Sequence, residues 1–188
     1  MSLLLSPNYI ARHLAPGETI AYPTEGVWGL GCRPDDQQAV EKILLLKGRS
    51  WTKGLILVAS ELDQLTPYIA SISEQQKLSI REFWPGAVTF LITKTDRVPT
   101  WISGTSDKVA VRVSNHPTVI ELCNELGGPL VSTSANPAGE IAAESAAAVV
   151  QYFGTKINYI CEGELGGHKG ASEIRDLETG ALLRAAII

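Results

Sequence analysis

The sequence predicts an α/β fold: a single domain with a twisted, mostly mixed open sheet and flanking helices. Its 188 residues suit one domain, and a chain of this size can bury roughly 70% of its unfolded surface. Segments with the pattern of strands alternate with segments of helical periodicity, and glycine-rich loops follow several strands. Because long irregular segments separate some of the strands, we expect the sheet to be mixed.

The chain begins with a predicted helix, a strand and a loop. Ser6 and Pro7 favour a helix start and Gly17 a stop, because proline is tolerated in the first turn and glycine closes helices. Residues 19–22 have the pattern of a strand, which leads into a loop over 23–31. The three glycines and one proline of that loop indicate that its backbone approaches something closely, so the loop is a candidate wall of a ligand site.

The next predicted helix carries basic residues at its end. Asp35 can cap its amino terminus, and Lys47-Gly48-Arg49 falls at its carboxyl end, so the two cations emerge from a rigid support. Residues 55–59 form an apolar run that is too short for a helix and is typical of a strand buried on both faces. The side chains expected on the buried side of the helix are Val40, Ile43, Leu44 and Leu46.

A further helix is predicted over 73–84. Ser73 and Gln76 can form a capping box at its start, and Pro85-Gly86 ends it. A strand at 87–92 follows.

The strand predicted at 109–113 contains one arginine. Alternation places Arg112 on the opposite face from Val109, Val111 and Val113. An arginine inside a strand needs a partner, and two interpretations stay open. It either forms an ion pair with an acidic residue elsewhere, or binds an anion from a pocket-facing strand.

The remaining elements continue the alternation of strands and helices. His116 precedes a proline, which favours a helix-start residue over a catalytic base. The elements expected are a helix over 116–126, a strand at 130–131, a helix over 145–153, a strand at 157–161, a glycine-rich loop over 163–170 and a strand at 182–188.

Composition and charge exclude several classes of protein. The net charge of −4 argues against a broad, non-specific nucleic-acid binder, which needs many Lys and Arg contacts to phosphates. The three cysteines form no Cys-x-x-Cys pair, which indicates neither a disulfide framework nor a zinc site. The amino terminus has no basic head, and no apolar stretch approaches the ~18 residues that cross a membrane. We therefore expect a soluble cytoplasmic protein with no membrane contact.

Two short clusters, Lys47-Gly48-Arg49 and Ser132-Thr133-Ser134-Ala135-Asn136, carry the strongest functional signal. They predict two walls of one anion-binding site, with cations on one side and hydroxyl, amide and backbone donors on the other. Each has a common structural explanation, because Lys-x-Arg is usually a solvated face and Ser/Thr/Asn runs are usually turns. The chain has no G-x-x-x-x-G-K-[ST] loop and no G-x-G-x-x-G after a strand, so a nucleotide would bind by another scheme.

A series of short motifs along nearly the whole chain resembles the YrdC/TsaC family. Taken in order and with compatible spacing, the motifs are highly specific, although each alone is weak. They are Tyr22-Pro23-Thr24-Glu25, Gly29-Leu30-Gly31, Lys47-x-Arg49, Lys53-Gly54-Leu55-Ile56, Trp84-Pro85-Gly86, Ala110-Val111-Arg112-Val113, Ser132-Thr133-Ser134-Ala135-Asn136, Ser172-Glu173-Ile174-Arg175-Asp176 and Leu183-Arg184.

The resemblance implies a YrdC-like fold and the activity of the family's single-domain bacterial members, the threonylcarbamoyl-AMP synthases. These nucleotidyltransferases convert ATP, L-threonine and bicarbonate into threonylcarbamoyl-AMP and pyrophosphate. A separate transfer complex uses the product to make threonylcarbamoyladenosine in tRNA. Such chemistry depends on positioning and charge neutralisation more than on a protein nucleophile. The resemblance also implies Mg²⁺, which the ATP phosphates carry and no set of protein carboxylates holds, so no residue is assigned to a metal.

The resemblance also assigns roles by motif. The catalytic residues, which would hold phosphates and the reacting carbamate, are Lys47, Arg49, Ser134 and Asn136. The threonine-binding residues are Thr24, Arg112 and Ser132, of which Ser132 could serve either substrate. The nucleotide side additionally includes Arg184 and Ser172. Glu25 is either a group behind the substrate contacts or a loop cap.

The chain departs from the family pattern at Gly26 and Trp28, where a hydroxyl or small residue and a tyrosine are expected. These positions bear on the shape of the threonine pocket. We expect one domain over 1–188, with a core from about residue 6 and no additional C-terminal domain.

Two other functions remain open. The basic pocket could instead belong to a double-stranded RNA, ribosomal or tRNA binding module, and tRNA binding is possible for the synthase although not required. Carbamoyl transfer is the second, because a related domain occurs in multidomain hydrogenase-maturation proteins. The chain lacks the zinc-finger cysteines and extra domains that this second role entails.

Overall fold

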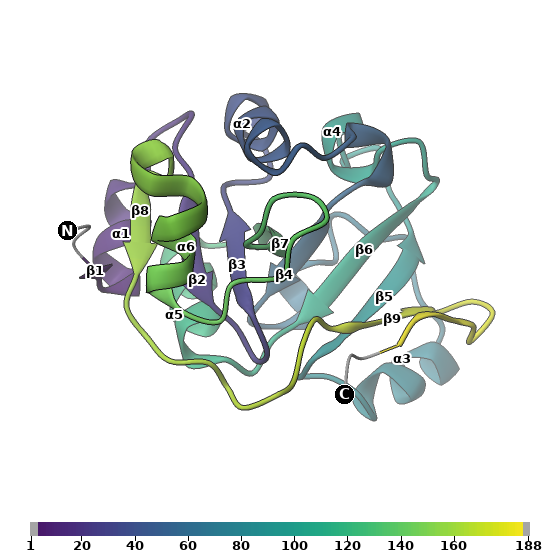
Figure 1. Ribbon diagram of the computed structural model, residues 1–188. Coiled ribbons are helices and arrows are strands. Elements are labelled where there is room, and N and C mark those ends of the chain that lie inside the picture. Colours follow the sequence, from purple (N-terminus) through teal and green to yellow (C-terminus); the bar gives the residue numbers. More distant parts are fainter. Residues whose placement is uncertain (1–3, 186–188) are drawn as a thin grey trace.

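The computed structural model describes residues 4–185. Their backbone forms one ten-stranded sheet with helices on both faces (Figure 1). The strands in spatial order are β1 (Leu4–Leu5), β8 (Tyr159–Cys161), β2 (Ile20–Pro23), β3 (Trp28–Gly31), β7 (Leu130–Ser134), β4 (Ile56–Ala59), β6 (Lys108–Val113), β5 (Val88–Thr93), β9 (Glu173–Asp176) and β10 (Leu182–Arg184). The pairs β1–β8, β2–β8, β4–β6 and β5–β9 are parallel and the other neighbours are antiparallel, which confirms the predicted mixed sheet.

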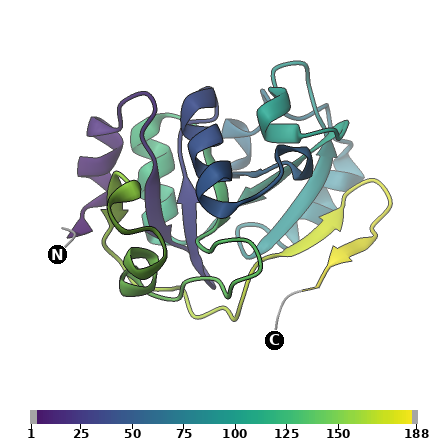
Figure 2. The same cartoon turned by 45° about the horizontal axis from the view of Figure 1, so that its top comes forward.

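The helices cover both faces of the sheet and bury two hydrophobic clusters. The helices are α1 (Pro7–His13), α2 (Gln37–Lys47), α3 (Glu74–Arg81), α4 (Thr100–Ser103), α5 (Pro117–Leu126) and α6 (Ala146–Phe153), with short 3₁₀ turns η1 (Trp51–Lys53), η2 (Leu62–Gln64) and η3 (Gly154–Lys156). In β4, Val58 packs with α1 and α5, whereas Leu57 and Ala59 join the larger cluster with α2 and α6. Because successive strand residues face opposite sides, the two clusters lie on opposite faces. Figure 1 shows α5 behind the sheet and α6 in front, and Figure 2 brings α2 and α4 forward.

Helix caps occur where the sequence predicts them at most positions. The Ser6 side chain accepts a hydrogen bond at the start of α1, and Ser145 does the same for α6. Ser73 and Gln76 form the capping box of α3. His116 occupies the N-cap position of α5 and Pro117 its first turn, which confirms the prediction of a helix-start residue.

The start of α2 differs from the prediction by one residue. The cap is Asp36 rather than Asp35, and its carboxylate accepts the backbone N–H of Ala39 at 2.9 Å. The other carboxylate oxygen of Asp36 accepts the N–H of Gly17 at 2.6 Å. This second bond ties α2 to the loop after α1, a long-range contact that the local pattern does not contain. α1 itself ends at His13, before Gly17.

The loop predicted over 23–31 is wrong in its second half, because Trp28–Gly31 forms β3. The glycines there make room for neighbours in the sheet. A Cβ on Gly31 would lie 2.3 Å from the Val131 carbonyl oxygen and 2.9 Å from the Tyr22 ring. The glycines that suggest a loop therefore belong to a strand, where they leave room for the Tyr22 side chain to pack against its backbone.

Other element ends also differ from the prediction. The strand predicted at 130–131 continues to Ser134, because it pairs with β3 and β4 on its two sides. The strand predicted at 182–188 ends at Arg184, and residues 186–188 lie outside the described residues. The predicted elements do not include β1, α4 and β9, which are short.

The β9–β10 hairpin is fixed to the rest of the sheet by charge. Lys108 Nζ on β6 lies 2.7 Å from Asp176 Oδ2 at the end of β9, in a pair whose side chains are mostly buried. The other oxygen of Asp176 accepts the backbone N–H groups of Glu178 and Thr179, both at 3.0 Å, which shapes the hairpin turn. The hairpin thereby brings Arg184 back toward the sheet.

Two further features of residues 4–185 bear on the class of protein. All three cysteines, Cys32, Cys123 and Cys161, are buried and free. None of the helices in this part of the chain is long and apolar enough to span a membrane.

Candidate active site

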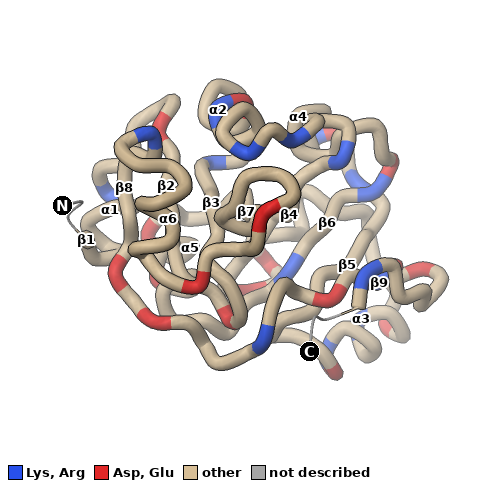
Figure 3. The backbone as a smooth tube through the Cα atoms, viewed as in Figure 1, with Lys and Arg blue, Asp and Glu red and all other residues tan. Residues whose placement is uncertain are grey.

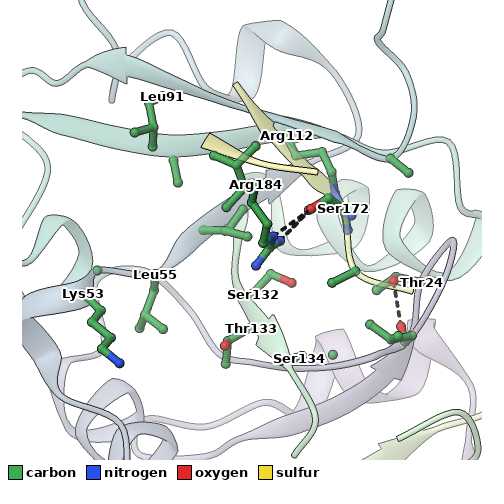
Figure 4. A pocket seen from close by; sticks show the side chains of 18 of the residues that line it. Thr24, Lys53, Leu55, Leu91, Arg112, Ser132, Thr133, Ser134, Ser172 and Arg184 are labelled. Carbon is green, nitrogen blue, oxygen red and sulfur yellow. Dashed lines mark hydrogen bonds between the residues drawn. The ribbon is translucent and has the colours of Figure 1, made fainter. Parts of the chain in front are cut away.

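A cavity of about 330 Å³ is lined by β3, β5, β6 and β7, by the chain after α2, and by the segment that leads into β9 (Figure 4). It gathers residues that lie more than a hundred positions apart in the sequence. The predicted site residues that line it are Thr24, Arg49, Arg112, Ser132, Ser134, Ser172 and Arg184. The other two, Lys47 and Asn136, are outside the lining but adjoin it through Ser134.

For Arg112 the sequence leaves two interpretations open, an ion pair or a pocket-facing anion-binding side chain, and the structure shows features of both. It projects from β6 on the cavity-facing side together with Ala110, while Val109 and Val111 lie in the core. Its Nη2 is 3.4 Å from Glu25 Oε2, and both side chains are 7% exposed. The arginine is therefore paired with an acid and also faces the cavity.

Residues with hydroxyl groups line the same cavity as this arginine. Thr24 donates its hydroxyl hydrogen to the Val27 carbonyl oxygen at 2.7 Å, which leaves the lone pairs of the hydroxyl as acceptors. Ser132 lines the same cavity from β7. Figure 4 shows Thr24 and Lys53 on opposite sides of the view, with Ser132 between them.

Lys47 joins the two clusters that the sequence singles out. Its Nζ donates to the carbonyl oxygens of Ser134 and Asn136, the second at 2.7 Å, and to Asn136 Oδ1 at 3.2 Å. Burial, and secondly the charge of Arg49, lower the pKa of Lys47 to about 8. An ammonium has three hydrogens, so these three acceptors occupy all of them. In this arrangement Lys47 holds the turn after β7 in place.

The Asn136 side chain is also committed to that turn. While its Oδ1 accepts from Lys47, its Nδ2 donates to the carbonyl oxygens of Pro137 at 3.1 Å and Glu140 at 2.7 Å. The backbone N–H of Ala138 donates to the Lys47 carbonyl oxygen at 2.7 Å. The turn is thus fixed from both ends, and Ser134 at its start lines the cavity.

Three guanidinium groups concentrate positive charge in the cavity. Burial, and then the charges of Arg49 and Arg112, lower the pKa of Arg184. Arg184 donates from Nη2 and Nε to the Ser172 carbonyl oxygen at 2.7 and 3.1 Å. Ser172 in turn lies 2.9 Å from the Thr89 hydroxyl, which anchors it to β5. An anion that entered the cavity would relieve the repulsion between the arginines.

Arg49 retains unused hydrogen-bonding capacity. Its Nη2 donates to the Gly54 carbonyl oxygen at 3.0 Å, whereas its buried Nε has no hydrogen-bond partner in the described part of the chain. Burial lowers its pKa. Figure 3 shows further Lys and Arg positions near the end of α2 and around α4, on this side of the sheet. The cavity is therefore suited to a multiply charged anion.

Some lining residues are not in the predicted set. Lys108 lines the cavity from β6, and alternation from Arg112 through Ala110 could have identified it. Lys53 also lines it, next to the apolar Leu55. Of the apolar lining, Val27 and Trp28 belong to the candidate ligand wall predicted over 23–31, whereas Leu91 and Ile102 had no signal in the sequence.

Residues 163–172, the segment between β8 and β9, form one wall of the cavity. The N–H groups of Gly166 and His168 donate to the carbonyl oxygens of Thr24 and Glu25 at 3.1 and 2.8 Å. A Cβ on Gly26 would lie 2.1 Å from the Gly170 carbonyl oxygen, so glycine at this position permits the close approach. The departure from the family pattern at Gly26 thus lies under this segment.

The described residues contain no group of three or more His, Cys, Asp or Glu side chains placed to hold a metal ion. Glu25, the acidic residue beside the cavity arginine, is engaged in its ion pair.

Comparison with known proteins identifies relatives that match nearly the whole chain. The profile of the Sua5/YciO/YrdC family, described as "Telomere recombination", matches residues 12–186. A protein of Cellvibrio japonicus named threonylcarbamoyl-AMP synthase is 45% identical over 177 residues, which cover 94% of each chain.

Two solved structures of P. abyssi Sua5 have the same fold. A double variant superposes with a TM-score of 0.92 at 30% identity, covering 100% of this chain and 61% of that one. The complex of Sua5 with L-threonine gives a TM-score of 0.89 at 32% identity, covering 96% of this chain and 54% of that one. The chain thus spans between half and two thirds of those two longer chains.

Proposed function

The chain belongs to the Sua5/YciO/YrdC family, and on that premise we propose that it is a threonylcarbamoyl-AMP synthase. It would form threonylcarbamoyl-AMP and pyrophosphate from L-threonine, bicarbonate and ATP, as a nucleotidyltransferase of tRNA threonylcarbamoyladenosine synthesis. The P. abyssi relative is described in complex with L-threonine, which supports the same amino acid as substrate here.

One observation carries the proposal. A single cavity contains Arg112 beside hydroxyl groups and, within electrostatic reach, Arg49 and Arg184. An amino acid offers one carboxylate and ATP offers a chain of phosphates, so the reaction needs cationic groups for both in one enclosed space. The cavity supplies them.

The reaction has two steps. The threonine amine and bicarbonate combine to give a carbamate and water. A carbamate oxygen then bonds to the α-phosphorus of ATP, and the bond from that phosphorus to the bridging oxygen of the β-phosphate breaks to release pyrophosphate. Neither step requires a protein nucleophile, so the protein contributes orientation and charge neutralisation.

The proposed roles follow the placement of the residues. Arg112 grips the threonine carboxylate with two N–H donors, and Thr24 and Ser132 contact the amino acid. Arg49 and Arg184 neutralise the phosphates. Ser134 and Ser172 offer hydroxyl donors to the nucleotide and the carbamate. Lys47 and Asn136 serve the same step by shaping the turn that presents Ser134.

Mg²⁺ would arrive with ATP, bound mainly by phosphate oxygens and water, and would shield the triphosphate charge. The product would pass to a separate tRNA threonylcarbamoyl-transfer complex. We also propose a cytoplasmic location, where buried free thiols such as Cys32 stay reduced.

Pyrophosphate release with each of threonine, bicarbonate and ATP omitted in turn tests the function. Release that requires all three supports the synthase. The comparisons favour the synthase over an RNA-binding module built on the same pocket. Double-stranded RNA binding that persists at physiological salt, without substrate-dependent pyrophosphate release, would overturn this assignment.

A further inference from the structure

We propose that Glu25 is a positioning residue for the amino-acid substrate, which acts by fixing the orientation of Arg112. The inference rests on the proposed function, because it assigns the substrate carboxylate to Arg112. It concerns a residue that would not touch the substrate itself.

The two carboxylate oxygens of Glu25 have different partners: one is hydrogen-bonded to the protein, and the other faces Arg112. Its Oε1 accepts the Ser114 hydroxyl at 2.7 Å and the Asn115 backbone N–H at 3.3 Å. Its Oε2 is buried, has no hydrogen-bond partner in the part of the chain that the structure describes, and lies 3.4 Å from Arg112 Nη2. One oxygen is therefore anchored to the chain before α5, and the other faces the guanidinium.

The anchor itself is rigid. The Ser114 hydroxyl oxygen accepts the backbone N–H of His116 at 3.1 Å, so its hydrogen is left to point at Glu25. His116 is 5% exposed, and its Nε2 donates to the Glu164 carbonyl oxygen at 2.9 Å. The Glu25 backbone carbonyl is in turn held by His168 of the 163–172 segment. Both the backbone and the side chain of Glu25 thus have fixed positions.

The guanidinium plane of Arg112 must be oriented before it can bind a carboxylate with two hydrogen bonds. Among residues 4–185, its buried Nε has no hydrogen-bond partner, and Glu25 is the acidic residue paired with it. A guanidinium offers five N–H donors in a planar fork, and a two-pronged grip on a carboxylate works only in the correct plane. Since one Nη group faces Glu25, that contact sets the plane and leaves other donors for the substrate.

If Glu25 only neutralised the charge of Arg112, its removal would have the opposite effect on threonine binding from the loss of a positioning residue. Removing a negative charge next to Arg112 would strengthen the attraction between the arginine and a substrate carboxylate. Loss of orientation would weaken that binding. The sign of the change in threonine affinity therefore distinguishes the two roles.

The experiment compares Glu25→Gln with the unmodified enzyme in pyrophosphate release, measuring KM for threonine, KM for ATP and kcat. The amide keeps the shape of the side chain and can still accept from Ser114. We expect KM for threonine to rise about tenfold or more, because a neutral amide no longer holds the guanidinium in the plane that grips the carboxylate, with KM for ATP unchanged. An unchanged or lower KM for threonine would overturn the inference.

Two further variants keep the test decisive. Ser114→Ala removes one anchor of Oε1 and preserves the ion pair, so a smaller rise in KM for threonine is expected even if Glu25→Gln folds poorly. Glu125→Gln makes the same chemical change in the ion pair with Arg12, neither residue of which lines the cavity, and should leave KM for threonine unchanged. An equal rise in KM for threonine in Glu125→Gln would contradict a specific role for Glu25.

Failure of the proposed function has a different signature. In that case the unmodified protein releases no pyrophosphate with threonine, bicarbonate and ATP. If it does release pyrophosphate and Glu25→Gln behaves identically, only the positioning role is wrong.

Discussion

Lys47 Nζ reaches from the end of α2 to the turn after β7, where it lies 2.7 Å from the Asn136 carbonyl oxygen and 3.2 Å from Asn136 Oδ1. These residues belong to two clusters that are separated by more than eighty positions in the sequence. The contact makes the clusters one structural unit. It also means that the lysine is bonded to protein oxygens, whereas the buried Nε of Arg49 has no partner among the described residues.

Replacement of Lys47 by alanine should affect both stability and turnover. It removes the donor to three oxygens, two of them backbone carbonyls, so we expect the free energy of unfolding to fall by about 2 kcal/mol. Loss of the turn that presents Ser134 should lower kcat by about 100-fold. Urea denaturation and pyrophosphate release measure the two effects. Lys42→Ala on the same helix is the control, because Lys42 bonds to Asn158 away from the cavity, and should change neither by much.

Arg49→Ala should lower turnover and leave the fold intact. Within residues 4–185 the Arg49 side chain makes one hydrogen bond, to the Gly54 carbonyl oxygen, so little of this structure depends on it. We expect KM for ATP to rise and kcat to fall by about 100-fold, as for loss of a group that stabilises developing charge. Circular dichroism should stay unchanged. Normal pyrophosphate release in both this variant and Lys47→Ala would remove these two residues from the site.

The protonation of Lys47 predicts a pH dependence. Burial and the charge of Arg49 lower its pKa to about 8, so the ammonium that fills three acceptors is present below that pH and is lost above it. We expect kcat/KM for ATP, at saturating threonine and bicarbonate, to decline up to about tenfold per pH unit above this pKa. Arginine stays charged across this pH range, so kcat/KM for ATP should not decline in Lys47→Arg. In Lys42→Ala the decline should remain, because Lys47 is unchanged. A flat profile between pH 7 and 9.5 in the unmodified enzyme would contradict the prediction.

The sequence predicts the parts of the site that depend on local pattern. Alternation along one strand is enough to place Arg112 opposite Val111, and the structure agrees. A helix that ends at Lys47 is likewise predictable, because Gly48 adopts the left-handed conformation with φ of 60° that closes α2. Such features depend on residues that are neighbours in the chain.

Long-range pairing explains what the sequence does not predict. β9 has no strand pattern of its own, and it forms because Thr89 pairs with Ile174 in parallel and Asp176 meets Lys108. The register of that pairing brings Ser172 into the cavity. Gly31 in β3 is predicted as a loop residue, because the nearby Tyr22 ring that requires a glycine is visible only in three dimensions.

Arg112→Lys should separate the two substrates. Lysine retains the positive charge but lacks the planar fork, so it cannot grip a carboxylate with two parallel hydrogen bonds. Since Arg112 is buried and paired with Glu25, the change also alters a buried ion pair. We expect threonine affinity to fall at least about 30-fold, equivalent to about 2 kcal/mol, while ATP affinity changes little.

Isothermal titration of each substrate separately gives the result for Arg112→Lys without catalysis. Arg184→Lys is the matched control, because it makes the same change on the nucleotide side of the cavity and should weaken ATP instead. An equal loss of both affinities in Arg112→Lys would place Arg112 with the nucleotide. Retained threonine binding would mean that the carboxylate is held elsewhere, and the most direct alternative is then the hydroxyl and backbone donors of β7 around Ser132.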